Sequence, residues 1–251
     1  MTTRSRIAFS ALCVLLLAAA ASVAAAATVK FVNVDAALSG VSTQQMKSAL
    51  MYVHPDVLAL QELQNQAEGG RAAVESMARS LRMYFAYEPA YSGADYGSAI
   101  LSRYPIVKSA PLSGSAVNKL LGMKADVRIG RQIVKVALVR PRDAAEAAYS
   151  EGVVDKLVKE AANHNLILMA SFDSKSAMGS VKAWGRAGLQ DAAVALRSAQ
   201  MTYPAGKPTE RLDYILINPA VRPHLKAMGV VKNAQLRGSS QHMPIQLTVT
   251  Y

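Results

Sequence analysis

The chain has 251 residues, 51% of them hydrophobic and 18% charged, which is enough for one sizeable hydrophobic core or at most two small domains. Lys and Arg outnumber Asp and Glu by 28 to 17, and the net charge of +11 favours anionic partners such as nucleic acid, phosphorylated metabolites or acidic lipid. The single cysteine, Cys13, excludes an intramolecular disulfide, so a hydrophobic core must hold the fold together.

Residues 1–27 are predicted to be a secretory signal peptide. Arg4 and Arg6 precede an apolar run at 7–21, and the alanines at 25–27 offer small residues for cleavage. An uncleaved membrane anchor is the alternative, because the run approaches the thickness of a bilayer, but its alanine-rich end favours cleavage. We therefore expect a secreted, lumenal or periplasmic protein without a permanent membrane anchor. Its mature chain has 26 basic and 17 acidic residues, a net charge of +9.

Helices and strands alternate along the rest of the chain. Helical spacing of apolar residues predicts helices from about residue 42 to 53, at 72–82 and at 152–163. Apolar or alternating runs predict the strands, which are 29–34, 57–61, 83–87, 123–129, 132–139, 166–170, 212–217 and 245–249. Gly130 and Arg131 join two of them in a tight hairpin. No shift in composition marks a boundary, so we expect one α/β domain over residues 28–251.

Polar side chains stand at the ends of several predicted strands. Pro55 ends the first helix, and the apolar strand after it delivers Glu62 to the rim of the sheet. The other members of this set are Asp35, Ser171, Asp173, Asp213 and His242. One such residue alone is usually a solvated side chain. A converging set is what a metal-assisted hydrolytic site requires.

Four segments resemble motifs of a known family. They are Pro-Asp-Val-Leu-Ala-Leu-Gln-Glu at 55–62, Gly-Ser-Ala-Ile-Leu-Ser-Arg-Tyr-Pro-Ile at 97–106, Arg-Leu-Asp-Tyr-Ile-Leu at 211–216 and Ser-Gln-His-Met-Pro-Ile at 240–245. In this order they resemble the endonuclease/exonuclease/phosphatase superfamily, which has the fold of pancreatic deoxyribonuclease. The resemblance implies an α/β (α+β) fold: a four-layer α/β/β/α sandwich of two packed mixed β-sheets flanked by helices, with the site at one edge.

The resemblance also implies a metal-dependent site. In this family a divalent metal, usually magnesium, is held by an acid that matches Glu62. If the protein is an active enzyme, we expect Asp35 to be a second acidic ligand. Magnesium keeps several waters, so one or two carboxylates suffice, and the ion neutralises phosphate charge and stabilises the leaving oxygen. His242 matches a histidine that a neighbouring aspartate polarises. The catalytic residues we expect are His242 and Asp213, which keep the family's residue type, and Asp173.

Two motifs depart from the family's pattern. Its Ser-Asp-His is Ser-Gln-His at 240–242, so Gln241 brings no charge to a metal or to an imidazolium. Its Gly-Asp-Phe-Asn is Ala-Ser-Phe-Asp at 170–173, which puts Ser171 where an aspartate is usual and Asp173 where an asparagine is usual. The group expected to position or deprotonate the attacking water is therefore changed.

Two further positions differ from the pattern. The family's first-strand asparagine falls on Asp35, and the histidine of its Thr-His-Leu context falls at Val139 and Arg140, where no histidine is present. Losing one aspartate of a catalytic group commonly costs orders of magnitude in rate. Losing several groups together argues against ordinary catalysis.

Two readings of the function follow. In the first, the site is partly lost, and the protein is a weak or inactive phosphoesterase that binds a phosphate-bearing or other anionic ligand, with nucleic acid among the candidates. Its ligand-binding residues would be Arg140, Ser171, Arg211 and Gln241. In the alternative, the protein is an active Mg-dependent phosphodiesterase or phosphatase in which rearranged acids compensate for the lost ones.

The basic residues are dispersed along the sequence, as in a basic protein that is merely soluble and has no dedicated anionic partner. We expect a monomer.

Overall fold

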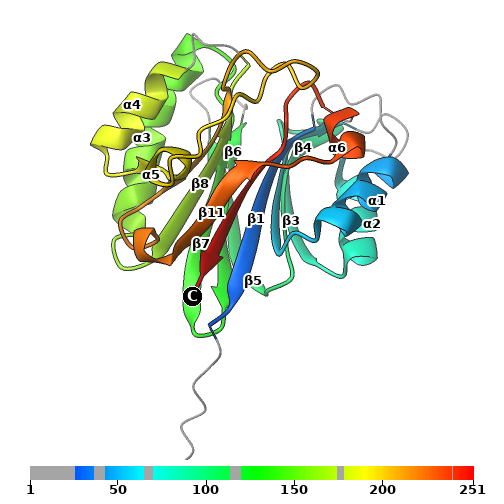
Figure 1. Ribbon diagram of the computed structural model, residues 1–251, viewed down its shortest axis with the longest axis horizontal. Coiled ribbons are helices and arrows are strands. Elements are labelled where there is room, and N and C mark those ends of the chain that lie inside the picture. Colours follow the sequence, from blue (N-terminus) through cyan, green and yellow to red (C-terminus); the bar gives the residue numbers. More distant parts are fainter. Residues whose placement is uncertain (1–25, 37–42, 65–69, 114–119, 174–177, 239) are drawn as a thin grey trace, which may run out of the picture.

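The computed structural model of the protein describes residues 26–36, 43–64, 70–113, 120–173, 178–238 and 240–251 (Figure 1). The predicted signal peptide lies outside these residues up to position 25, and so does residue 42, the predicted start of the first helix. Within the described ranges, no helix is both long enough and apolar enough to cross a membrane.

Two six-stranded sheets form the centre of the molecule. The first has the order β11-β12-β1-β2-β4-β3, with β1 (Thr28–Asp35), β2 (Val57–Gln64), β3 (Tyr84–Pro89), β4 (Tyr96–Ser102), β11 (Leu225–Val230) and β12 (Ile245–Thr250). The second has the order β5-β6-β7-β8-β10-β9, with β5 (Ile106–Ser113), β6 (Leu120–Ile129), β7 (Gln132–Val139), β8 (Asn165–Ser171), β9 (Gln190–Asp191) and β10 (Asp213–Ile217). Both sheets are mixed, because β1 runs parallel to β2 and β7 parallel to β8 while their other neighbours are antiparallel.

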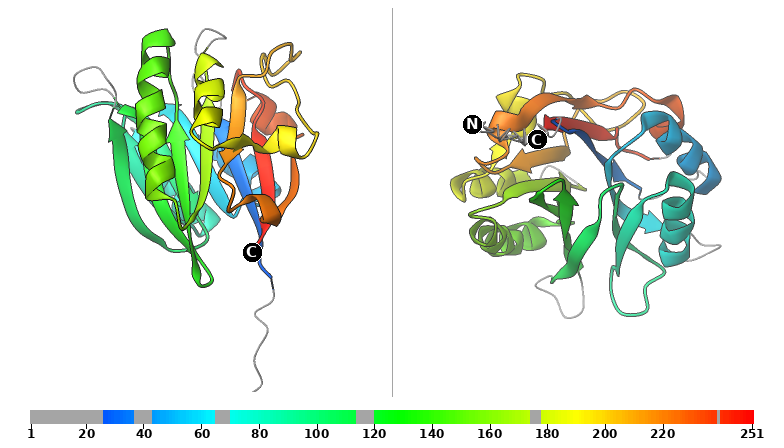
Figure 2. Two further views of the ribbon diagram at one scale, coloured as in Figure 1. Left: turned by 90° about the vertical axis from the view of Figure 1, so that its left-hand side faces the viewer. Right: turned by 90° about the horizontal axis from the view of Figure 1, so that it is seen from below.

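Helices cover the outer face of each sheet and complete the four layers (Figure 2). The first sheet carries α1 (Thr43–Val53), α2 (Gly70–Leu81) and α6 (Ala234–Gly238). The second carries α3 (Ala144–Glu160) and α4 (Gly179–Arg186), while α5 (Ala192–Ala195) and the 3-10 turn Arg222–His224 belong to the connections. The α/β/β/α sandwich implied by the resemblance is confirmed.

Neighbouring residues on a strand face different cores. On β1, Phe31 lies in the apolar core between the two sheets, whereas Val32 and Val34 face the core beneath α1 and α2. All of β8 is buried, because one of its faces meets the central core and the other meets α3 and α4. A strand covered on both faces needs apolar side chains throughout, which explains the continuous apolar run at 166–170.

The predicted elements are largely present, and the differences have local causes. The prediction that a helix begins at 152 is wrong, since α3 begins at Ala144, where the side chain of Asp143 caps it by accepting a hydrogen bond from Glu146 N at 2.8 Å. Gly152 is an interior residue of this helix. None of β4, β5, β9 and β11 is predicted as a strand from the sequence. Three of them, β5, β9 and β11, lie at sheet edges, where an exposed strand needs no continuous apolar run, whereas β4 lies between β2 and β3 and begins just before the family-like motif at 97–106.

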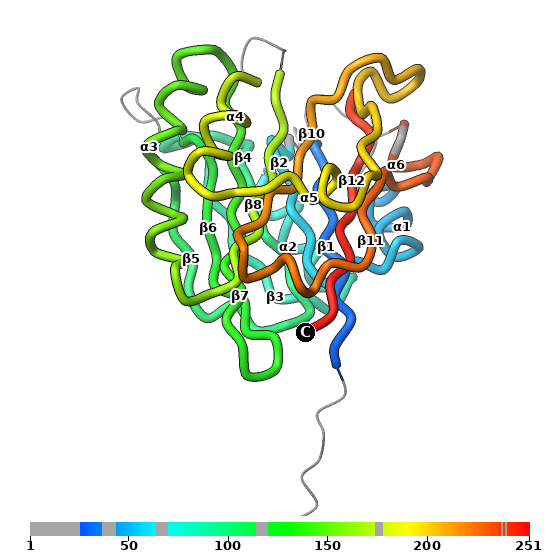
Figure 3. The backbone as a smooth tube through the Cα atoms, turned by 60° about the vertical axis from the view of Figure 1, so that its left-hand side comes forward, coloured from blue at the N-terminus to red at the C-terminus, as the bar shows by residue number. Residues whose placement is uncertain are grey.

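The last strand returns to the first, as the trace in Figure 3 shows. β12 runs antiparallel to β1, with Ile245 opposite Asn33. The segment just before β12 therefore reaches the end of β1, which brings His242 next to Asp35.

Candidate active site

Both sheets bring polar residues to one edge of the sandwich. In the first sheet, Asp35 at the end of β1 is opposite Gln61 on β2, and Glu62 is the next residue. In the second, Ser171 at the end of β8 is opposite Asp213, the first residue of β10. The parallel strands β1 and β2 end at the same edge, and β10 begins where its antiparallel partner β8 ends. Sites in such folds form at the carboxyl ends of strands.

Glu62 has an unusual backbone conformation. Its φ angle is +50°, in the left-handed region that residues other than glycine rarely adopt. The pairing of β2 with β4 shifts register between Leu60 and Leu63, so Glu62 lies in a bulge. Bulges redirect a side chain at sheet edges next to functional sites, and this one turns Glu62 toward Arg140 and Arg142.

A chain of buried hydrogen bonds crosses from one sheet to the other. Gln61 Nε2 donates to Asn33 Oδ1 at 2.7 Å, and Asn33 Nδ2 donates to Ser171 Oγ at 3.1 Å. Ser171 Oγ in turn donates to Asp213 Oδ1 at 2.7 Å. These four side chains are almost fully buried, so each hydrogen bond compensates for the loss of water. The chain fixes both the position and the orientation of Asp213.

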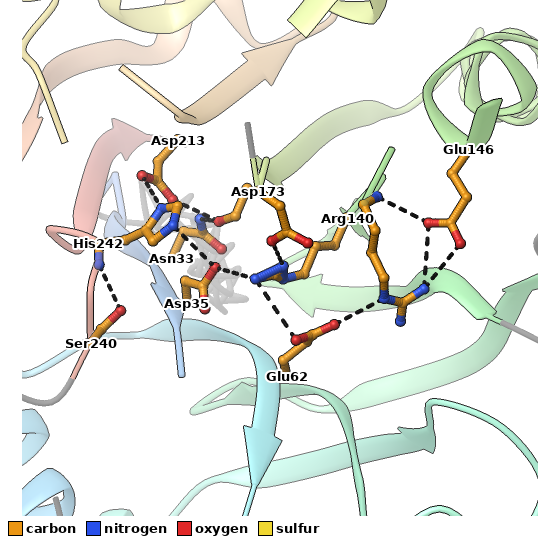
Figure 4. A network of polar contacts seen from close by, with 11 residues as sticks. Asn33, Asp35, Glu62, Arg140, Glu146, Asp173, Asp213, Ser240 and His242 are labelled. Carbon is orange, nitrogen blue, oxygen red and sulfur yellow. Dashed lines mark hydrogen bonds and ion pairs between the residues drawn. The ribbon is translucent and has the colours of Figure 1, made fainter. Parts of the chain in front are cut away.

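His242 is held by the second oxygen of Asp213. Its Nδ1 lies 2.9 Å from Asp213 Oδ2, and its Nε2 lies 3.8 Å from Asp35 Oδ2 (Figure 4). Burial disfavours the charged imidazole, but the hydrogen bond to Asp213 and the charges of Asp213 and Asp35 outweigh it and raise the pKa of His242 above its ordinary value of 6.5. The ring of Tyr203 packs against His242 with 5.0 Å between centroids.

Arg140 lies among three carboxylates. Its Nη2 is 3.0 Å from Asp35 Oδ2 and 3.8 Å from Glu62 Oε2, and its Nη1 donates to Asp173 Oδ1 (Figure 4). Arg140 follows β7, whereas Asp35 ends β1, Glu62 lies in the bulge of β2 and Asp173 follows β8, so the guanidinium joins both sheets. Burial works against its charge, but Asp35, Glu62 and Asp173 raise its pKa above the ordinary value.

Arg142 extends the ionic cluster toward α3. Its Nε donates to Glu62 Oε1 at 3.1 Å, and its Nη1 donates to Glu146 Oε1 at 3.2 Å. The backbone N of Arg142 also donates to Glu146 Oε2 at 3.0 Å. Glu62 is therefore shared between two arginines, one at each of its carboxylate oxygens.

The site does not fit a magnesium ion as its side chains are placed. In the part of the chain that the structure describes, no three or more His, Cys, Asp and Glu residues are arranged to hold a metal. The two predicted ligands, Asp35 and Glu62, face the guanidinium of Arg140 instead. A divalent cation beside that guanidinium would meet a like charge at close range.

The structure brings most of the predicted site residues together. Contacts through Arg140 link Glu62 and Asp173 to Asp35, and contacts through His242 link Asp35 to Asp213. Ser171 joins the same group through Asp213.

Arg211 and Gln241 stand apart from this group. Arg211 makes two hydrogen bonds to Asp191, at 2.6 and 2.8 Å, and its guanidinium lies 4.3 Å from the centre of the Tyr214 ring. Gln241 is exposed, and its backbone carbonyl oxygen accepts a hydrogen bond from Ala205 N at 2.7 Å.

Sequence reasoning missed Asn33, Gln61, Arg142 and Glu146. Asn33, an asparagine of the first strand two residues before Asp35, lies within the hydrogen-bond chain. The available signal was a polar residue at an inner position of an apolar strand. For Arg142 and Glu146, the available signal was a basic and an acidic residue four positions apart at the start of a helix.

The model of the Endonuclease/Exonuclease/phosphatase family matches residues 32–234, and the chain belongs to this family. Its fold is shared by an endonuclease/exonuclease/phosphatase family protein from Leptotrichia buccalis, with 16% identity over 89% of this chain and 100% of that one, and a TM-score of 0.69.

Two further solved structures are similar. A 3′ phosphatase, NExo, from Neisseria, bound to a product DNA hairpin, has 18% identity over 89% of this chain and 100% of its own, with a TM-score of 0.68. TDP2 from D. rerio, complexed with a single-strand DNA product, has 19% identity over 88% of this chain and 98% of its own, with a TM-score of 0.68. No curated protein matches the sequence.

Proposed function

We propose that the protein is an exported member of this family that binds a phosphate-bearing ligand and hydrolyses phosphate esters weakly or not at all. The predicted signal peptide supports export. The loss of hydrolysis is supported by one observation: each carboxylate at the site is engaged by the protein's own donors.

The engagement of the carboxylates is extensive. Asp213 accepts hydrogen bonds from Ser171 and His242. Asp35 and Asp173 form ion pairs with Arg140. Glu62 forms ion pairs with two arginines, Arg140 and Arg142. A general base must reach the proton it abstracts, and a metal ligand must offer free lone pairs. Ser171 is also a weaker base than the aspartate that the resemblance leads us to expect at its position.

The phosphate-bearing ligand is supported by charge and by relatives. The mature chain has a net charge of +9, and two similar structures contain DNA products. The buried cluster itself has more acids than bases, so a phosphate would be attracted by basic groups around it. Lys207 is such a group, because it is exposed on the loop whose Ala205 N is hydrogen-bonded to Gln241 O.

The test is an activity screen of the purified protein on a chromogenic phosphodiester and a single-stranded oligonucleotide, with Mg²⁺, with Mn²⁺ and with a chelator. We expect turnover near background under all three conditions, and the same low rate for the Glu62→Ala variant. Binding is measured by fluorescence anisotropy with a 5′-phosphorylated oligonucleotide and its unphosphorylated counterpart, and we expect tighter binding of the first. Vigorous Mg²⁺-dependent turnover that Glu62→Ala abolishes would support the active Mg-dependent phosphodiesterase instead.

A further inference from the structure

The three carboxylates around Arg140 require a cation. Asp35 is fully buried at its side chain, Glu62 is mostly buried and Asp173 is partly exposed. Carboxylates brought together in this way repel one another and lose water, so without a positive charge between them the folded state is destabilised. Arg140 supplies that charge from within the chain, and its side chain is itself 7% exposed.

The position of Arg140 follows from the backbone. β7 runs parallel to β8 with Val139 opposite Ala170, so the residue after β7 emerges at the same edge as the residues that follow β8. The backbone N of Arg140 donates to Leu121 O at 2.9 Å, which anchors the start of the side chain. The guanidinium then reaches Asp173 with one terminal nitrogen and Asp35 with the other.

We propose that the guanidinium of Arg140 takes the place of a divalent metal, and that removing it turns the Asp35, Glu62 and Asp173 cluster into a binding site for Mg²⁺ or Mn²⁺. This inference deepens the proposed function and rests on it, since it explains how a metal-dependent fold forms its site without the ion. One fixed cation satisfies the carboxylates in the folded protein. The same cation repels a divalent ion and occupies the oxygens that such an ion would need.

The experiment compares the wild-type protein with Arg140→Ala and with Arg142→Ala. The second variant is the matched control, since it also removes an arginine from Glu62 but leaves Arg140 between the carboxylates. Melting temperature is measured in chelator, in MgCl₂, in MnCl₂, and in NaCl of equal ionic strength, which removes effects of screening alone. Mn²⁺ binding is measured separately by electron paramagnetic resonance.

We expect the melting temperature of Arg140→Ala to be lowered in chelator and to recover in part with either divalent ion but not with NaCl. The ion raises the melting temperature because a ligand stabilises the state to which it binds. The Mn²⁺ affinity of Arg140→Ala should exceed that of the wild type and of Arg142→Ala by about tenfold or more, because the like charge is gone and the carboxylate oxygens are released. The inference is overturned if the ions leave this variant unchanged, or if they raise the melting temperature of all three proteins equally.

The wild type alone provides a test that does not depend on the variant folding. Wild-type protein that binds Mn²⁺ at a site abolished by Glu62→Gln contradicts the inference, whereas the absence of such a site supports it.

The two proposals can fail separately. Turnover in chelator would contradict the proposed function and leave Arg140 in the role of the cation. Mn²⁺ bound at Glu62 without turnover would contradict this inference alone.

Discussion

Asp213 orients His242 through a hydrogen bond of 2.9 Å between Oδ2 and Nδ1. A carboxylate only accepts hydrogen bonds, so Nδ1 carries the proton and donates it to Asp213. Nε2 then points toward Asp35, 3.8 Å away. The other oxygen of Asp213 accepts from Ser171. The pair therefore keeps a geometry in which a histidine is fixed in one tautomer between two acids.

The first prediction concerns pH. The folded state raises the pKa of His242 above 6.5, so the protonated imidazolium stabilises the fold. This contribution is fully present below pH 6.5 and is lost as the pH rises through the folded-state pKa. Melting temperature across this range should therefore fall more steeply for the wild type than for His242→Asn. His164→Asn, a change at an exposed histidine, should keep the slope of the wild type, and an equal slope for all three proteins would contradict the assignment.

The second prediction concerns the hydrogen-bond chain between the sheets. Ser171→Ala removes the group that bonds both Asn33 Nδ2 and Asp213 Oδ1, and it leaves these buried atoms with one partner fewer. The free energy of unfolding should fall by about 1–3 kcal/mol, measured by urea denaturation. Ser109→Ala on the exposed side of β5 is the control and should change little. A loss no larger than the control's would mean that water replaces the hydroxyl.

The comparison of sequence with structure shows which part of the site is predictable. Asp35, Glu62, Asp213 and His242 converge because they stand at strand ends, and strand ends can be read from runs of apolar residues. The absence of the family's histidine at Val139 and Arg140 also follows from the sequence, through a family motif. Both inferences depend on local patterns.

The ionic partners of the site could not be predicted in the same way. The guanidinium of Arg140 reaches residues on β1, on β2 and just after β8, and only the packed sheets determine which carboxylates it meets. Arg142 binds Glu146 because α3 begins at Ala144, whereas the sequence placed that helix start at 152. Local spacing does not report such long-range contacts, and an error in one helix boundary removes a residue from the predicted site.

The third prediction concerns Gly97, the first residue of the family-like motif at 97–106. Gly97 pairs with Leu63, next to Glu62, and a Cβ atom on it would lie 2.2 Å from the carbonyl O of Glu88. Gly97→Ala should therefore separate β3 from β4 and lower the free energy of unfolding by about 3 kcal/mol. Gly152→Ala is the matched control: its Cβ would meet nothing within 4 Å, and it should stabilise α3 by about 0.5–1 kcal/mol. Equal effects of the two changes would contradict this packing argument.

The fourth prediction tests where a phosphate-bearing ligand binds. Lys207 is exposed on the loop that is hydrogen-bonded to Gln241, whereas Ser171 is fully buried beneath the site. Lys207→Ala should weaken binding of a 5′-phosphorylated single-stranded oligonucleotide by up to about 1 kcal/mol, roughly fivefold. If Lys207 contacts a phosphate, the slope of log affinity against log salt should become less steep by about 0.7.

The control for this measurement is Lys182→Ala, which removes an exposed lysine of α4 and the same unit of charge. A general effect of net charge would weaken binding equally in both variants, because dispersed charges act at long range and are screened by salt alike. A contact near Gln241 would affect Lys207→Ala alone. Equal losses would therefore place the ligand elsewhere on the basic surface, and Arg140 would then serve the fold without any part in recognition.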